Sequence, residues 1–270
     1  MRTVTVSLFH FLLFIIVAVC FSCSCCDGNS NVLCIESERE ALLKLKNDLI
    51  DPSNKLSSWV EGGNCCKWNG VVCHNLTGHV DQLHLAAEPY EWLKLGGTIN
   101  PSLLQLKHLT SLNLSYNNFS SIQIPDFFGL LVSLTYLDLS LAQFQGPIPH
   151  NLGNLSKLQY LDLRCDLSSW GMEAKSLEWV SRLSSLQYLD LSGVDLYKAT
   201  DWLQVTFNLP SLLELHLFGC SLENQIPDYS GNMSFLEVVD LSLNSLNSTM
   251  PNSLFSLDHL QSLDLSNNIC

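Results

Sequence analysis

Residues 134–144 read LTYLDLSLAQF, and the same spacing of leucines returns along the chain. The matching segments are LTSLNLSYNNF, LQYLDLRCDL, LQYLDLSGVDL, LLELHLFGCSL, LEVVDLSLNSL and LQSLDLSNNIC. The leading leucines of all seven segments are residues 109, 134, 158, 186, 212, 236 and 260, so the intervals are 25, 24, 28, 26, 24 and 24 residues. A period this regular indicates a protein built from repeated structural units.

Each segment contains the pattern L-x-x-L-x-L, which is the signature of a leucine-rich repeat. An eighth, irregular unit precedes the seven at Val80, Leu83 and Leu85. Alternation in a motif such as LDL predicts a short strand with its leucines pointing inward. One unit cannot bury its apolar face alone, so the units must stack. We therefore predict a solenoid of about eight repeats over residues 80–270, the last of them truncated.

The rest of each repeat predicts how the chain leaves and returns to the sheet. An asparagine stands three positions after the second leucine at Asn117, Asn244 and Asn268, where its side chain can bond backbone groups of the turn. In the other four repeats this position holds Ala142, Asp166, Val194 or Cys220 instead of asparagine. The longer returns AKSLEWVSRL and ATDWLQVTFNL predict short amphipathic helices, the second with Thr200 as its N-cap.

The N-terminus predicts entry into the secretory pathway. Arg2 precedes the apolar run LFHFLLFIIVAVCF, and small residues follow at Ser22 and Ser24. This is the order of a secretory signal peptide, which we place at residues 1–24. The run is 14 residues long, whereas a membrane span needs about 20, which disfavours the alternative of an uncleaved anchor. The mature chain should therefore meet an oxidising environment.

The segment CCKWNGVVC at residues 65–73 is consistent with either a metal site or a disulfide framework. Adjacent cysteines cannot easily aim two thiolates at one tetrahedral centre, and the paired C-x₂₋₄-C of structural zinc sites is missing. A bridge between the adjacent Cys65 and Cys66 would be strained. We therefore predict disulfides Cys34–Cys65 and Cys66–Cys73 and no metal. Cys165, Cys220 and Cys270 should be free.

Residues 25–79 predict a small N-terminal cap. Ser37 and Glu40 have the spacing of a capping box ahead of apolar residues at helical spacing, and Asp51-Pro52 ends that helix. The apolar residues of the segment are few, so a unit of this size needs disulfides to be stable.

The cap motif CIESEREALL…DPSNKLSSW…CCKWNGVVC, followed by repeats of the form LxxLDLSxNxLxGxIP, resembles plant leucine-rich-repeat receptor-like proteins. The similarity is greatest to the group that includes receptors for a fungal xylanase, and it covers essentially the whole chain. It implies an α/β fold: a right-handed leucine-rich-repeat solenoid (horseshoe) with a concave parallel β-sheet and a disulfide-stapled N-terminal helical cap. It also implies an ectodomain that detects pathogen- or self-derived molecules and relies on membrane partner kinases.

Members of that family usually carry many more repeats, a second cap, a transmembrane helix and a short cytosolic tail. This sequence stops at LDLSNNIC, inside a repeat. We expect a chain that ends there to expose the apolar edge of its last repeat and to associate or be poorly soluble. The 270-residue chain would be secreted to the apoplast, whereas a full-length member would be a type I protein of the plasma membrane.

Charge and motif content argue against several functions. The net charge of −13 disfavours nucleic acid and anionic membrane surfaces as partners. We find no Ser-His-Asp order, no H-E-x-x-H, no P-loop and no dinucleotide-binding glycine motif. The sequence therefore predicts a binding protein that is not an enzyme and needs no cofactor or metal.

Two positions of each strand should point out of the concave face. The first row reads Ser111, Tyr136, Tyr160, Tyr188, Glu214, Val238 and Ser262. The second reads Asn113, Asp138, Asp162, Asp190, His216, Asp240 and Asp264. The aspartates belong to the repeat's own consensus, so we place an acidic stripe there but favour the tyrosines as contacts. The predicted ligand-binding residues are Tyr136, Tyr160, Arg164, Tyr188, His216 and Phe218, for a protein, peptide or glycan partner.

Six N-x-S/T sequons predict glycosylation of a secreted chain, at Asn75, Asn113, Asn118, Asn154, Asn232 and Asn247. Asn113 falls on the concave sheet, so a glycan there would cover that part of the surface. The other five are compatible with flanks or loops.

Two functions remain open at this stage. The first is the recognition ectodomain of a receptor-like protein in plant defence. The second is a soluble inhibitor of a microbial cell-wall hydrolase, like the plant polygalacturonase inhibitors, which share this cap and repeat type. Further repeats and a hydrophobic span beyond Cys270 would support the receptor, whereas an immediate stop and a second cap would support the inhibitor.

Overall fold

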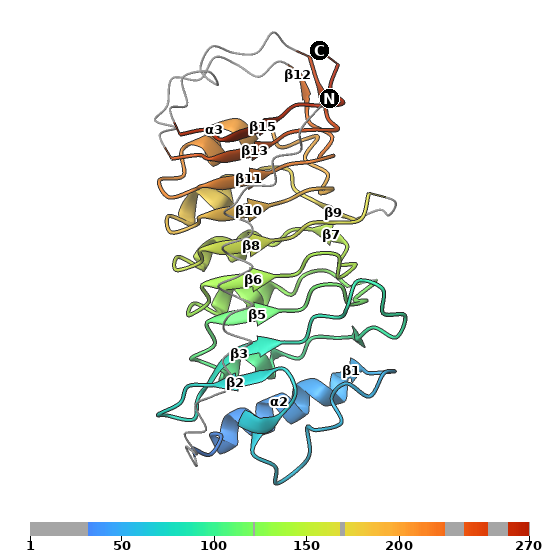
Figure 1. Cartoon of the computed structure of the whole chain (residues 1–270), viewed down its shortest axis with the longest axis vertical. Helices are drawn as coiled ribbons and strands as arrows, with labels where there is room; N and C mark the ends of the chain where they lie inside the picture. Colours follow the sequence, from blue (N-terminus) through green and yellow to red (C-terminus); the bar gives the residue numbers. More distant parts are fainter. Residues whose placement is uncertain (1–31, 121, 168–170, 225–234, 248–258, 270) are drawn as a thin grey trace. The chain divides into compact units, whose positions relative to one another are not determined.

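The LxL motifs form the strands of one continuous sheet (Figure 1). A computed structural model describes residues 32–120, 122–167, 171–224, 235–247 and 259–269. Among these residues the large sheet has nine strands in the order β15-β13-β11-β10-β8-β6-β5-β3-β2. They are β2 (Val71–Cys73), β3 (Val80–His84), β5 (Ser111–Asn113), β6 (Tyr136–Asp138), β8 (Tyr160–Asp162), β10 (Tyr188–Asp190), β11 (Glu214–His216), β13 (Val238–Asp240) and β15 (Ser262–Asp264).

The strands of the repeats lie in register and parallel. Leu137 of β6 pairs with Leu112 and Leu161 on either side, and the same relation continues along the stack. These central leucines are fully buried because they point into the solenoid. The pair β2–β3 is antiparallel, and it joins the cap to the first repeat. The chain is therefore a right-handed leucine-rich-repeat solenoid, as the resemblance implied.

The returns between strands are short and mostly of 3₁₀ type. They contain η2 (Pro101–Gln105), η3 (Asp126–Leu130), η4 (His150–Asn154), η5 (Glu178–Arg182) and the α-helix α3 (Trp202–Phe207). Three further pairs of two-residue strands form outside the large sheet within the described residues. They are β1 (Leu49–Ile50) with β4 (Gly96–Gly97), β7 (Gly146–Pro147) with β9 (Met172–Glu173), and β12 (Glu223–Asn224) with β14 (Ser245–Leu246). The two returns for which the sequence predicts helices contain η5, which is a 3₁₀ helix, and α3.

The predicted N-cap at Thr200 is wrong. The residue before α3 is Asp201, and its side chain does not cap the helix. Its carboxylate instead accepts bonds from Ser176 Oγ at 2.6 Å and from Leu177 N at 3.0 Å. The carboxylate thus fixes the preceding return, which sequence spacing alone does not indicate.

The cap is built on α2 (Glu36–Asp48) and on η1 (Cys65–Lys67). The predicted capping box is wrong, because the helix begins one residue before Ser37 and Ile35 precedes it without a side-chain cap. Glu38 provides the anchor instead: it is buried, and its carboxylate bonds to His79 Nδ1 at 2.8 Å and to Val80 N at 2.7 Å. The first helical turn is thereby tied to β3.

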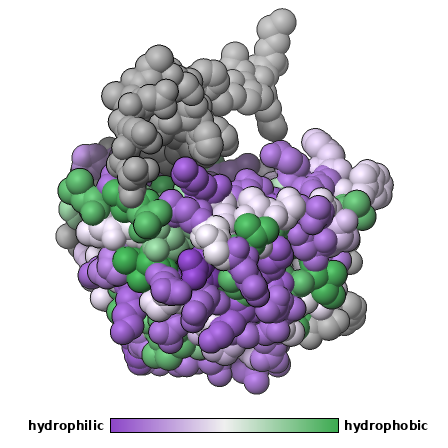
Figure 2. Space-filling view, turned by 90° about the horizontal axis from the view of Figure 1, so that it is seen from below, coloured by the Kyte–Doolittle hydropathy of each residue, from purple (hydrophilic) through white to green (hydrophobic). Residues whose placement is uncertain are grey.

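Disulfides and stacked indoles complete the cap. Cys34 pairs with Cys65 and Cys66 with Cys73, with Cα–Cα distances of 5.4 and 5.3 Å, which is the predicted pairing. Trp59 and Trp68 stack with ring centroids 5.5 Å apart, and both are buried. Seen from this end, the surface is mostly hydrophilic with separate hydrophobic spots (Figure 2). A polar outer face is what a terminal unit of a solenoid needs.

The asparagines of the turns bond as predicted. Asn117 is fully buried; its Nδ2 donates to Leu85 O at 2.8 Å and to Leu114 O at 2.9 Å, and its Oδ1 accepts from Leu95 N at 3.2 Å. Asn244 and Asn268 make the equivalent contacts. Each asparagine therefore links its own repeat to the one before it.

The predicted signal peptide lies outside the described residues. Within those residues, no helix has the length and apolar character needed to cross a bilayer.

Candidate functional site

The predicted ligand residues come together on the exposed face of the large sheet. Tyr136, Tyr160 and Tyr188 are register partners on β6, β8 and β10, and Glu214 of β11 continues their row. The second row follows two residues later, from Asp138 through Asp162 and Asp190 to His216. Neighbouring strands are about 4.8 Å apart, so these side chains form one surface, which we call the tyrosine patch. The patch consists of Tyr136, Tyr160, Tyr188, Arg164, Glu214 and His216.

The three tyrosine rings stack on one another. Tyr136 and Tyr160 have ring centroids 4.4 Å apart with planes 10° from parallel. Tyr160 and Tyr188 are 4.3 Å apart with planes 7° from parallel, and His216 lies 5.3 Å beyond Tyr188. The faces between neighbouring tyrosines are therefore turned to each other, whereas the row continues beyond Tyr136 with Ser111, which has no ring. Along most of the row a partner meets ring edges and hydroxyl groups. Flat stacking of a sugar on a tyrosine face is disfavoured inside this row.

The expected acidic stripe is mostly beneath the surface. Asp138, Asp162 and Asp190 are buried, and each Oδ1 accepts a bond from the backbone N–H two residues later. Asp240 and Asp264 make the same contact at 2.9 and 2.8 Å. This local turn explains why aspartate recurs in the motif. The aspartates thus end the strands, and their charges lie below the tyrosine row.

Arg164 is the cation that faces these buried charges. Its guanidinium lies 3.4 Å from Asp162 Oδ2 and 3.6 Å from Asp190 Oδ2. Burial, with the nearby Asp190 and Asp138, raises the pKa of Asp162 from 3.8 to about 7, although Arg164 opposes the shift. Burial also raises the pKa of Asp138. One arginine thus faces three closely spaced carboxyl groups, so the patch favours additional positive charge.

His216 and Phe218 stand where most repeats carry aspartate and serine. His216 Nε2 lies 3.5 Å from Glu214 Oε2. Burial alone would lower the pKa of His216, but Glu214, Asp190 and Asp240 raise it above the ordinary value. Phe218 lies two residues beyond His216 and is partly exposed. Arg164 and Phe218 occupy equivalent positions in their repeats, and the strands that precede them, β8 and β11, are separated by β10.

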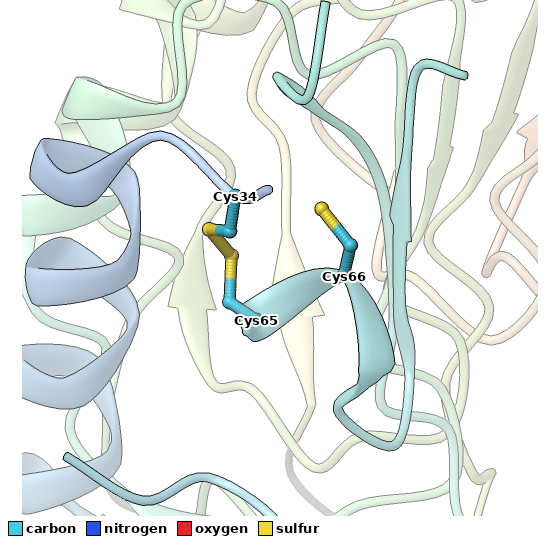
Figure 3. A group of neighbouring side chains, drawn as sticks. All are labelled: Cys34, Cys65 and Cys66. Atoms are coloured by element: carbon cyan, nitrogen blue, oxygen red, sulfur yellow. A yellow bond between two sulfur atoms is a disulfide. The ribbon is translucent and has the colours of Figure 1, made fainter. Parts of the chain in front are cut away.

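Three cysteine sulfurs of the cap, those of Cys34, Cys65 and Cys66, lie within 4.8 Å of one another (Figure 3). Each is already part of a disulfide, so none offers the thiolate that a metal ligand requires. The cluster is a structural staple. Cys165 and Cys220 are free thiols, as predicted, and burial raises the pKa of both.

Four of the sequon asparagines are exposed: Asn75, Asn118, Asn154 and Asn247. Asn232 lies outside the described residues. Asn113 is half-buried on β5, and its Oδ1 accepts from Ser115 N at 2.9 Å and from Ser115 Oγ at 2.8 Å. Ser115 is itself buried, so this sequon is much less accessible than the other four.

A second surface feature was missed at the sequence level. The segment between β3 and β4 carries Tyr90 and Trp92, which are 91% and 96% exposed. They line a groove of about 880 Å³ together with Ile50 and Asn118. The signal was available as two aromatic residues in the polar stretch EPYEWLK, outside any repeat position.

Family models match two parts of the chain. Residues 35–74 match the leucine rich repeat N-terminal domain, and residues 108–130 and 133–155 match the leucine rich repeat. Both are repeat-protein modules, and no catalytic family is indicated.

Similar proteins include plant receptor-like proteins. The chain is 34% identical to receptor-like protein EIX1 and 37% identical to receptor-like protein EIX2, both of Solanum lycopersicum, over 90% and 88% of its length. It spans about a quarter of these relatives, 27% and 26% respectively.

Solved structures of receptor ectodomains share the fold. The structure of PEPR1–AtPEP1 matches with a TM-score of 0.72 at 29% identity, over 87% of this chain and 32% of that one. The Arabidopsis receptor kinase HAESA, in complex with the peptide hormone IDA and the co-receptor SERK1, matches with a TM-score of 0.69 at 25% identity, over 87% of this chain and 42% of that one.

Proposed function

Because this chain is a leucine-rich-repeat protein related to the N-terminal part of plant receptor-like proteins, we propose that it is part of an extracellular recognition ectodomain. It binds a pathogen- or self-derived ligand in defence signalling, and partner kinases at the membrane carry the signal onward. Residues 1–24 direct it to the secretory pathway, 25–79 cap the solenoid, and 80–270 supply the recognition surface. It catalyses no reaction itself.

The observation that carries this proposal is the tyrosine patch. Three consecutive strands place stacked tyrosines in one row, with Arg164 and His216 beside them. Rigid aromatic side chains provide contact area at low entropic cost, and tyrosine and arginine are enriched at interface hot spots. The repeat motif does not require tyrosine, since Ser111 and Ser262 occupy the same position in other repeats. The row is therefore a feature of this surface and not of the fold.

The chemistry of the patch favours a peptide or protein ligand with a basic residue. The tyrosine hydroxyls offer hydrogen bonds, whereas the ring faces between neighbouring tyrosines are occupied by one another. Beneath them, the carboxyl groups of Asp138, Asp162 and Asp190 outnumber the charge of Arg164. A lysine or arginine of the ligand that reaches this row would gain attraction from these carboxyl groups, because a positive charge lowers their raised pKa values and favours the ionised form.

The test is a binding screen with the disulfide-bonded, secreted protein. Immobilised protein is exposed in parallel to basic peptides, acidic peptides, cell-wall oligosaccharides and fungal wall hydrolases, and bound material is quantified by interferometry. We expect specific, salt-sensitive binding from the basic peptide or protein class. Binding confined to oligosaccharides would contradict the ligand class, and inhibition of a hydrolase would identify the soluble-inhibitor function instead.

A further inference from the structure

The groove beside β4 lies outside the concave sheet and has no assigned role. The segment between β3 and β4 extends from the edge of the stack (Figure 1). The groove there has a volume of about 880 Å³, and its lining includes Ile50, Pro89, Tyr90, Trp92, Asn118 and Ile122. A volume of this size accommodates a small organic ligand. Trp92 is 96% exposed and Tyr90 is 91% exposed, so a large apolar area is in contact with water.

A glycosylation sequon lies in the lining of this groove. Asn118-Phe119-Ser120 has the acceptor pattern, and Asn118 and Ser120 both line the groove. Phe119 is buried, and its ring centroid lies 5.1 Å from that of Phe144. This stacking fixes the backbone between Asn118 and Ser120. Asn118 N donates to Leu95 O at 2.7 Å, so the sequon is also tied to the residue before β4.

The Asn118 side chain is presented for modification. It is exposed, and its Oδ1 accepts from Ser120 N at 3.2 Å. We find no acceptor for its Nδ2 among the described residues. The carbonyl oxygen is held by Ser120 N, and Asn118 lines the same groove as Tyr90 and Trp92.

We propose that Asn118 carries an N-linked glycan whose first sugars occupy this groove and pack against Trp92 and Tyr90. In the transfer step, C1 of the first sugar of a lipid-diphosphate-linked oligosaccharide forms a bond to Asn118 Nδ2. The lipid diphosphate leaves from C1, and Nδ2 loses one proton. The apolar face of a pyranose ring then covers one face of the indole, which reduces the apolar area that Trp92 exposes. The occupant is part of this molecule, so the groove is filled without a separate ligand.

The experiment uses the full chain secreted from a eukaryotic host that adds high-mannose N-glycans. Ser120→Ala removes the sequon at Asn118, and the matched control Ser156→Ala removes the exposed sequon at Asn154. Each protein is treated with N-bromosuccinimide, and oxidation of each tryptophan is followed by peptide mass spectrometry. Trp59 and Trp68 are buried in the cap and serve as internal references.

We expect Trp92 to oxidise at least about twofold faster in Ser120→Ala than in the parent, because the glycan covers one of the two ring faces. Ser156→Ala should leave the rate at Trp92 unchanged. A second variant, Trp92→Ala, keeps the sequon and should let an endoglycosidase trim the glycan at Asn118 faster, with no change at Asn154. An unmodified Asn118, or a glycosylated Asn118 with equal Trp92 oxidation in parent and Ser120→Ala, would overturn the proposal.

Discussion

Asn117→Ala tests whether the asparagines of the turns hold successive repeats together. The side chain is fully buried and bonds three backbone groups, Leu85 O, Leu114 O and Leu95 N. Alanine leaves all three without this partner in a buried turn. An unsatisfied buried backbone group costs about 1–3 kcal/mol, and partial relaxation reduces the sum, so we expect a loss of about 3–5 kcal/mol.

The assay is urea unfolding of the secreted, disulfide-bonded protein, followed by far-UV circular dichroism. Asn151→Ala is the matched control, because Asn151 is exposed in η4 and should change the unfolding free energy by less than about 0.5 kcal/mol. Asn117→Asp should be at least as harmful as Asn117→Ala, since a carboxylate oxygen would face the two carbonyls at 2.8 and 2.9 Å. An Asn117→Ala loss below about 1 kcal/mol would refute the reasoning.

Two further changes address the charges and the cap. Asp162→Asn should stabilise the protein at neutral pH. The pKa of Asp162 is raised from 3.8 to about 7, so the free energy of unfolding of the parent falls by about 2–4 kcal/mol as the pH rises between these values. The variant has no carboxyl group at this position and should not show this fall. Urea midpoints measured from pH 4 to pH 8 check this, and parallel pH profiles for parent and variant would count against it. Removing Cys66–Cys73 by paired serine substitution should cost about 2.5 kcal/mol, and removing Cys34–Cys65 about 3.7 kcal/mol, because the second disulfide closes the longer loop. Equal losses would contradict the loop-length argument.

Much of the fold could be predicted from the sequence because the repeat period constrains it. A strand alternates sides, so the position of each leucine fixes which neighbours point outward, and Tyr136, Tyr160 and Tyr188 fall in one row on this argument alone. The asparagine contacts follow from the same period, since each turn repeats the local geometry of the last.

The repeat period does not predict contacts between side chains that are far apart in the sequence. The bond from Glu38 to Val80 joins residues 42 positions apart, so local spacing suggested Ser37 as the cap instead. Likewise, the motif shows that aspartates point outward but not that their oxygens turn back to the backbone. The stacking of tyrosines above them then buries Asp162, which no pattern of single residues indicates.

The most direct test of recognition by the tyrosine patch is the affinity of a captured ligand for variants of that patch. Tyr160 is the central ring and Tyr188 stacks on it, so Tyr160→Ala and Tyr188→Ala are compared with the parent. Tyr160→Phe keeps the stack while removing one hydroxyl. Tyr197→Ala is the control, because Tyr197 is exposed and lies outside the strands of the sheet. We expect Tyr160→Ala and Tyr188→Ala each to weaken binding by about 1–2 kcal/mol, or roughly 5- to 30-fold in Kd, and Tyr197→Ala to have no effect. Unchanged affinity in both patch variants, with the fold intact by circular dichroism, would show that recognition lies elsewhere on the molecule.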